Sequence, residues 1–125
     1  MIYLDTHVVA WLFATAGEML SPAARTAIDE ADDIRISPMV RLELQYLYEI
    51  GCVTEAAAIV LDRLCPALGI TVCETSFVSV VHAAESLAWT RDPFDRLIVA
   101  QAALREAPLV TKDGVLHANY RRCVW

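Results

Sequence analysis

The sequence lacks the features of a membrane or exported protein. None of its apolar stretches approaches the roughly 20 residues that a membrane-spanning helix requires. The first strand-like segment starts at Ile2, which leaves no room for a signal peptide. We therefore expect a cytoplasmic protein that has no membrane partner.

Cysteine motifs are also missing. The chain has four cysteines but no CxxC pair, and no histidine stands at the spacing of a zinc site. We interpret these cysteines as buried, reduced thiols without a chemical role. They are Cys52, Cys65, Cys73 and Cys123.

Positive charge is scarce, since 10 Lys and Arg residues face 16 Asp and Glu residues, for a net charge of −6. Proteins that bind nucleic acids usually present a basic surface to the phosphates. The shortage of positive charge does not exclude nucleic-acid binding if several acids form one cation site, because bound divalent cations would make that region attract phosphate.

The chain is rich in apolar residues. Its 125 residues are 57% hydrophobic and 21% charged, which is more apolar than an average soluble domain. The length suits one domain, spanning residues 1–125, with a sizeable core. The excess of apolar residues predicts a deeply buried sheet, a subunit interface, or both.

Short apolar segments alternate with longer helical ones along the chain. The strands are expected over residues 2–4, 34–36, 69–73 and 108–111, with a weaker fifth over 122–125. The helices are expected over residues 7–14, 22–31, 38–50, 54–64, 76–89 and 94–106. This order predicts the α/β class, with a parallel sheet of four to five strands and helices on both faces.

Two acids follow expected strands, at the edge where open parallel sheets bind ligands. Asp5 comes directly after the first strand, and Asp113 comes two residues after the strand that ends at Thr111. Each also has a structural explanation, because Asp5 can cap a helix and Asp113 can belong to a turn before Gly114. We expect Thr6 to cap the first helix.

Glu43 stands out because its helix has a readable polar face. At 100° per residue, Glu43 lies nearly opposite that face and shares a stripe with Val40 and Leu47. A carboxylate among core residues is costly unless it is protonated, paired or bound to a cation. A buried ion pair with an arginine is the alternative to a site role.

Asp92 and Asp95 lie at the start of a helix. Asp92 can be the N-cap and Pro93 the first helical residue, which explains Asp92 in full. Asp95 lines up with Ile98 and Val99 on the apolar side of the helix, so it points toward the protein. It can cap and coordinate at once.

The positions of four acids in four separate segments favour one shared site. They are Asp5, Glu43, Asp95 and Asp113, with Asp92 as a possible neighbour. Carboxylates without nearby His or Cys suit Mg²⁺ or Mn²⁺. Such a site supports phosphodiester hydrolysis, in which the metal activates water and stabilises the leaving oxygen.

Other residues near these acids have two explanations each. Arg91 and Arg96 bracket the Asp95 position, where they would either hold RNA phosphates or form ordinary ion pairs. Thr111 would orient a metal-bound water or be an ordinary strand threonine. We interpret His7 and Trp11 as packing or surface groups.

The chain resembles the PIN-domain ribonucleases, in particular the VapC toxins of toxin–antitoxin pairs, over essentially its whole length. The matching stretches are Ile2-Tyr3-Leu4-Asp5-Thr6-His7, Ser37-Pro38-Met39-Val40-Arg41-Leu42-Glu43-Leu44, Arg91-Asp92-Pro93-Phe94-Asp95-Arg96-Leu97-Ile98-Val99-Ala100-Gln101-Ala102, and Leu109-Val110-Thr111-Lys112-Asp113. Their order and spacing are more specific than any one of them.

The resemblance implies an α/β/α sandwich and an acidic pocket that binds Mg²⁺ or Mn²⁺ through the same four acids. It also implies endonucleolytic cleavage of structured RNA, a homodimer, and a cognate VapB-like antitoxin that inserts a segment into the pocket. Such a partner would cover part of the apolar surface.

Three alternatives stay open at this point. A PIN domain can serve in RNA processing outside a toxin pair, or can bind RNA or protein without cutting. A response-regulator receiver is another small α/β fold, but it needs an acidic pair after its first strand, where Thr6 follows Asp5. A haloacid-dehalogenase-like phosphatase needs a second acid at the position of His7.

Overall fold

Five short parallel strands form one sheet in the computed structural model, which describes residues 1–125. The strands are β1 (Ile2–Leu4), β2 (Ile34–Ile36), β3 (Ile70–Val72), β4 (Leu109–Val110) and β5 (Cys123–Val124). They pair in the order β3-β2-β1-β4-β5, so β1 lies in the centre. The expected parallel sheet of four to five strands is thus confirmed, with all five present.

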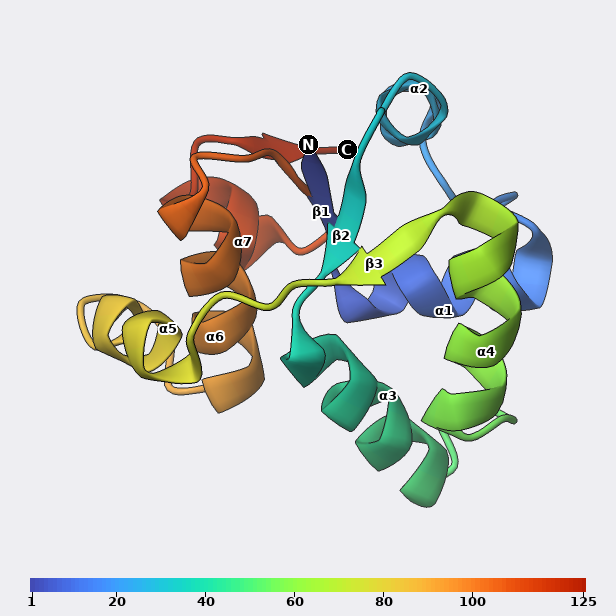
Figure 1. Cartoon of the computed structure of the whole chain (residues 1–125), viewed down its shortest axis with the longest axis horizontal. Coiled ribbons are helices and arrows are strands. Elements are labelled where there is room, and N and C mark those ends of the chain that lie inside the picture. Colours follow the sequence, from blue (N-terminus) through green and yellow to red (C-terminus); the bar gives the residue numbers. More distant parts are fainter.

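Seven helices surround the sheet. They are α1 (Thr6–Thr15), α2 (Pro22–Asp29), α3 (Pro38–Glu49), α4 (Ala57–Leu68), α5 (Phe77–Ala84), α6 (Pro93–Leu104) and α7 (Gly114–Asn119). In Figure 1, α5, α6 and α7 lie to the left of the strands, whereas α1 and α4 lie to the right. This arrangement confirms the expected α/β architecture with helices on both sides.

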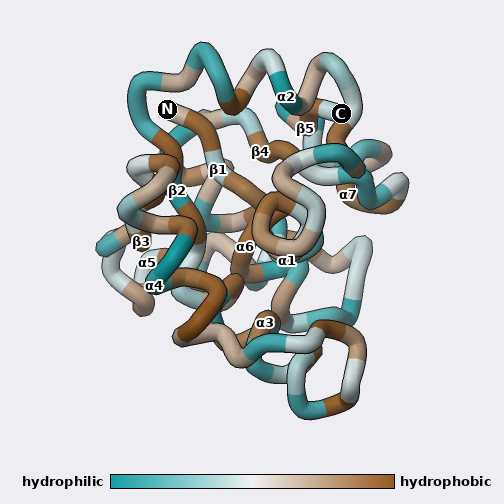
Figure 2. Tube along the Cα trace, turned by 90° about the vertical axis from the view of Figure 1, so that its right-hand side faces the viewer, coloured by the Kyte–Doolittle hydropathy of each residue, from teal (hydrophilic) through white to brown (hydrophobic).

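The core is built around the central strands. A single cluster of 25 buried residues includes all of β1, and Tyr3, Leu4, Leu109 and Val110 are fully buried. Figure 2 shows hydrophobic colour along β1 and β4, while several of the outer turns are hydrophilic. Because the side chains on both faces of these strands are buried, the strands are continuous apolar runs in the sequence.

The starts of three helices follow the sequence closely. Ser21 accepts a hydrogen bond from the backbone N–H of Ala24 at 3.1 Å, and Ser37 accepts one from Met39 at 3.1 Å. A proline is the first helical residue of α2, α3 and α6. These caps fix where each helix begins, and therefore which residues of α3 and α6 face inward.

Two expected helices have other bounds. The helix expected over 54–64 begins at Ala57 and runs through Pro66 to Leu68, and its buried face is formed by Val60, Leu61 and Leu64. The helix expected over 76–89 ends at Ala84. Packing outweighs the local preference of proline in the first case.

The chain after Thr111 forms α7, a six-residue helix that the sequence pattern did not reveal. It is too short to show helical periodicity, yet its Leu116 is fully buried.

The prediction of four buried cysteines was wrong, since Cys73 is buried but Cys52 is exposed. No helix combines the length and the apolar character that crossing a membrane needs.

Candidate functional site

Asp5 stands at the carboxyl end of the central strand and starts α1. Its backbone N–H donates to the carbonyl of Val110 at 3.0 Å, which continues the pairing of β1 with β4. Its carboxylate accepts a hydrogen bond from the backbone N–H of Thr6 at 2.7 Å. The expectation that Thr6 caps this helix was wrong: Asp5 is the N-cap, and Thr6 is the first helical residue.

The hydroxyl of Thr111 joins two of the candidate acids. It donates to a carboxylate oxygen of Asp5 at 2.6 Å and accepts from the backbone N–H of Asp113 at 3.1 Å. Asp113 in turn caps α7, because its carboxylate accepts from Val115 at 2.7 Å and Leu116 at 3.1 Å. Neighbouring parallel strands thus place Asp5 and Asp113 at one edge of the sheet.

Glu43 points inward from α3, as its helical position predicts. It is only 9% exposed and shares the buried face of α3 with Val40 and Leu44. No basic side chain pairs with it. The ion pairs of the structure join Arg35 with Asp33 and His82 with Glu85. The alternative of a buried pair with an arginine is therefore wrong.

Asp92 and Asp95 lie at the start of α6. The carboxylate of Asp92 accepts hydrogen bonds from the backbone N–H groups of Phe94 at 2.9 Å and of Asp95 at 3.4 Å, which confirms its role as the N-cap. Asp95 sits in the first turn and is half-buried.

The electrostatics of Asp95 show that the acids share one environment. Burial, with a smaller contribution from the carboxylates of Asp92, Asp5, Asp113 and Glu43, raises the pKa of Asp95 from an ordinary 3.8 to about 7. Such an effect requires that the carboxylates lie near one another. Folding therefore brings together acids from four segments of the chain.

Burial also raises the pKa of Asp5 and of Glu43. For Asp5 the hydrogen bonds from Thr111 and from the Thr6 backbone oppose the effect of burial, and the negative charge of Asp113 adds to it. For Glu43 the hydroxyl of Thr6 opposes the effect, and Asp5 adds to it. The site thus holds negative charge against its preference, and a bound cation would relieve this.

The donor atoms of the site fit a hard divalent cation. The candidate donor atoms are carboxylate and hydroxyl oxygens, and the buried hydroxyl of Thr6, beside Glu43, makes no hydrogen bond of good geometry. No three His, Cys, Asp or Glu side chains are arranged as a ready-made ligand cluster. The carboxylates would therefore have to close around an ion such as Mg²⁺ or Mn²⁺.

Two arginines lie near Asp95 but do not neutralise it. Arg91 donates to the carbonyl of Ala88 at 2.6 Å, and Arg96 donates to the carbonyl of Leu87 at 2.9 Å. Both bonds hold the loop between α5 and α6. The ion pairs considered from the sequence are absent, and the phosphate contacts of these arginines stay a prediction.

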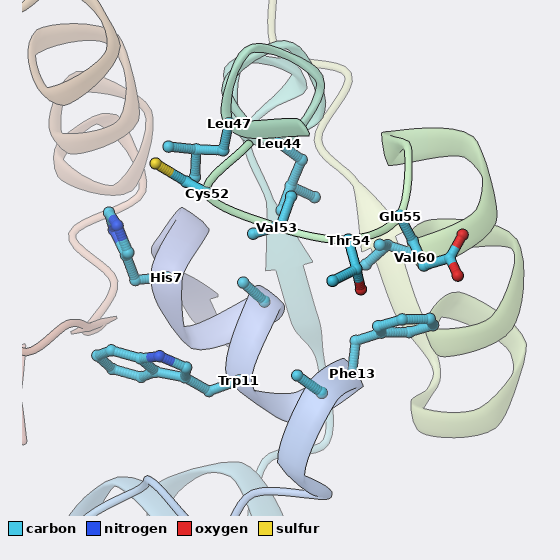
Figure 3. A pocket seen from close by; sticks show the side chains of 12 residues that line it. His7, Trp11, Phe13, Leu44, Leu47, Cys52, Val53, Thr54, Glu55 and Val60 are labelled. Carbon is cyan, nitrogen blue, oxygen red and sulfur yellow. The ribbon is translucent and has the colours of Figure 1, made fainter. Parts of the chain in front are cut away.

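Two of the cavities that adjoin α1 lie close to the candidate acids or to α3. One, of about 200 Å³, is lined by Asp5, His7, Trp11, Lys112 and Asp113. The other, of about 230 Å³, is mostly apolar and lies between α1, α3 and the loop before α4 (Figure 3). No sequence pattern indicates that Lys112 lies in this cavity, because its contact with Trp11 joins segments about 100 residues apart.

Comparison with known proteins agrees with this architecture. The family model described as the PIN domain matches residues 2–121. The chain is 32% identical over 120 residues to Ribonuclease VapC22 of Mycobacterium tuberculosis, covering 94% of this chain and 91% of that protein.

Solved structures show the same fold. VapBC2 from Rickettsia felis, bound to a DNA fragment from its promoter, matches with a TM-score of 0.67 at 19% identity, over 98% of this chain and 96% of that one. A toxin–antitoxin complex from Klebsiella pneumoniae matches with a TM-score of 0.69 at 18% identity, over 100% and 97%. With the family model and the ribonuclease relative, these findings show that the chain belongs to the PIN-domain family.

Proposed function

We propose that this chain is a divalent-metal-dependent endoribonuclease whose single PIN-like domain spans residues 1–125. One observation carries the proposal: carboxylates from separate segments raise the pKa of Asp95 together, and no basic side chain pairs with them. The ribonuclease name of the 32% identical relative supports RNA as the substrate. Action on cellular RNA fits the cytoplasmic location expected from the sequence.

The metal ligands in this proposal are Asp5, Glu43, Asp95 and Asp113, with Asp92 as a possible contributor. A bound Mg²⁺ or Mn²⁺ supplies Lewis-acid activation of water and stabilises charge on the phosphate. Thr111 orients Asp5 through their 2.6 Å hydrogen bond. The hydroxyl of Thr6, which lies beside Glu43 without a hydrogen bond of good geometry, would help to hold a water molecule.

Cleavage of RNA by the purified protein tests the proposal. Activity should require added Mg²⁺ or Mn²⁺ and stop with EDTA. Asp5→Asn and Asp95→Asn should each lose about 100-fold or more of the rate while remaining folded, because each removes a carboxylate that would hold the cation that stabilises the transition state. Asp62→Asn, an exposed acid on α4, serves as the matched control. Undiminished cleavage by both site variants would reject the proposed site.

We also propose that the protein is the toxin of a VapBC-type pair rather than an RNA-processing enzyme. The solved structures with the same fold are toxin–antitoxin complexes. The apolar cavity beside α1 would bind apolar side chains of a VapB-like antitoxin (Figure 3). Expression of the chain alone should arrest growth, and the product of an adjacent small reading frame should restore it. Growth unaffected by an active enzyme would favour RNA processing.

A homodimer is the proposed assembly, as the resemblance implies. Helix α5 carries exposed apolar residues that suit an interface, with Phe77 64% and Val78 78% exposed. Sedimentation should show a dimer, and Val78→Asp should shift it toward the monomer. A wild-type protein that stays monomeric at high concentration would reject this assembly.

A further inference from the structure

Aromatic side chains from opposite ends of the chain meet beside the acids. The rings of His7 and Trp11, on α1, have centroids 6.0 Å apart. The ring of Trp125, just beyond β5, lies 5.7 Å from that of Trp11. The ammonium of Lys112 lies 5.8 Å from the centroid of each tryptophan ring. We refer to His7, Trp11 and Trp125 as the aromatic shelf.

The aromatic shelf adjoins the proposed catalytic acids. His7, Trp11 and Lys112 line the same cavity of about 200 Å³ as Asp5 and Asp113. A group resting on the shelf would therefore lie next to a phosphate held at the acids. The tryptophans are half-buried, so each ring keeps part of its surface open.

Lys112 does not form the ion pairs that its position offers. Asp113 is its neighbour in sequence and Asp5 lines the same cavity, yet the ammonium lies over the tryptophan rings and makes no salt bridge with either acid. An exposed cation over an aromatic ring is held only weakly. Lys112 is therefore free to move to a phosphate when another flat group takes its place on the ring.

We propose that the aromatic shelf stacks an unpaired base of the RNA substrate beside the scissile phosphate, and that Lys112 contacts an adjacent phosphate. This proposal rests on the proposed ribonuclease function. Unpaired bases are commonly recognised by stacking on aromatic rings, with basic groups tracking the backbone. The shelf supplies both elements at one end of the acidic site, where the net charge of the chain otherwise opposes RNA.

Binding of two probes tests the shelf separately from cleavage. The probes are a short oligoadenylate and an abasic oligomer of the same length, which carries the same phosphates without bases. Stopped-flow quenching of tryptophan fluorescence in Mg²⁺ records binding before cleavage. Trp89→Phe serves as the parent protein, so that the emission comes from Trp11 and Trp125.

The parent should bind oligoadenylate about five- to 100-fold more tightly than the abasic oligomer, the range expected for one stacked base. Trp11→Leu and Trp125→Leu should each lose most of that difference. Lys112→Met should weaken binding of both probes by a similar factor, because it acts on phosphate. If Trp11→Leu does not fold, His7→Ala, at an exposed position, replaces it and should reduce the same difference.

The chain offers a matched control on the other side of α1. Arg63 lies over the ring of Phe13 at 5.8 Å, the same distance as Lys112 from its rings. In Figure 3, Phe13 projects away from His7 and Trp11. Phe13→Leu and Arg63→Met should therefore leave the affinities for both probes unchanged.

Several outcomes would overturn the shelf. Equal affinity of the parent for both probes shows that no base is stacked. A difference that survives in Trp11→Leu and also in Trp125→Leu, each measured through the tryptophan that remains, assigns stacking to another surface. Quenching by an antitoxin peptide but not by RNA assigns the shelf to a protein partner. If the protein cleaves RNA but shows no preference for oligoadenylate over the abasic oligomer, base stacking is rejected and the ribonuclease function stands. If it neither binds nor cleaves RNA, both proposals are rejected.

Discussion

Replacing Asp95 with asparagine should stabilise the metal-free protein while removing its cleavage activity. Burial and four neighbouring carboxylates raise the pKa of Asp95 from 3.8 to about 7. A shift of this size corresponds to about 4 kcal/mol against the charged form, at ~1.4 kcal/mol for each pKa unit. Because Asp95 is partly exposed to solvent, which screens its charge, we expect a gain of about 1–2 kcal/mol in the free energy of unfolding.

The pH dependence gives this prediction a sign. The folded protein keeps the proton on Asp95 to a higher pH than the unfolded chain does, so wild-type stability falls as pH rises from about 4 to about 7. The advantage of Asp95→Asn should therefore be small near pH 3, where Asp95 is mostly neutral in both states, and complete near pH 8.

Urea denaturation in EDTA at both pH values measures the effect. Asp62→Asn, which removes an exposed charge on α4, should change stability little. Adding Mg²⁺ should stabilise the wild type but not Asp95→Asn, because a ligand that binds only the folded state raises its stability. An Asp95→Asn protein that is no more stable than the wild type at pH 8 would refute the shared acidic site.

Further variants separate the roles of the neighbouring residues. Thr111→Val should lower the free energy of unfolding by about 1–3 kcal/mol and raise the pKa of Asp5, because it removes the 2.6 Å hydrogen bond; denaturation and titration test this, with Thr111→Ser retaining the bond. Asp113→Ala should cost about 0.5–2 kcal/mol by uncapping α7, whereas Asp113→Asn should keep the cap yet lose cleavage; equal stability of the two variants would contradict the capping role. Glu43→Leu should stabilise the metal-free protein in denaturation assays, since a buried carboxylate without a partner is replaced by an apolar side chain, while RNA cleavage is lost.

The sequence predicted the sheet because its strands carry little else than apolar residues. Tyr3 and Leu4 lie in a strand that is covered on both faces and paired on both edges, and such strands leave a plain apolar run in the sequence. The sequence also predicted that Glu43 points inward, because the Ser37 cap fixes the start of α3 and the helical period then sets the face on which Glu43 lies.

What the sequence did not reveal depends on contacts between distant segments. The Thr111 hydroxyl reaches Asp5 across 106 positions of the chain, and Lys112 reaches Trp11 across a similar gap. No local pattern encodes these contacts, because they follow from the order of β1, β4 and β5 in the sheet. Helix α7 was missed for another reason: six residues are too few to show a period.

The structural and the chemical explanations of these acids turn out to be compatible. Asp5, Asp92 and Asp113 are the N-caps of α1, α6 and α7, so three helices present their positive ends to the same acidic space. Backbone N–H groups offset part of the repulsion between the carboxylates without supplying a countercharge that would compete with a metal ion. Helix capping by Asp5, Asp92 and Asp113 therefore lowers the cost of keeping these acids together in the metal-free protein.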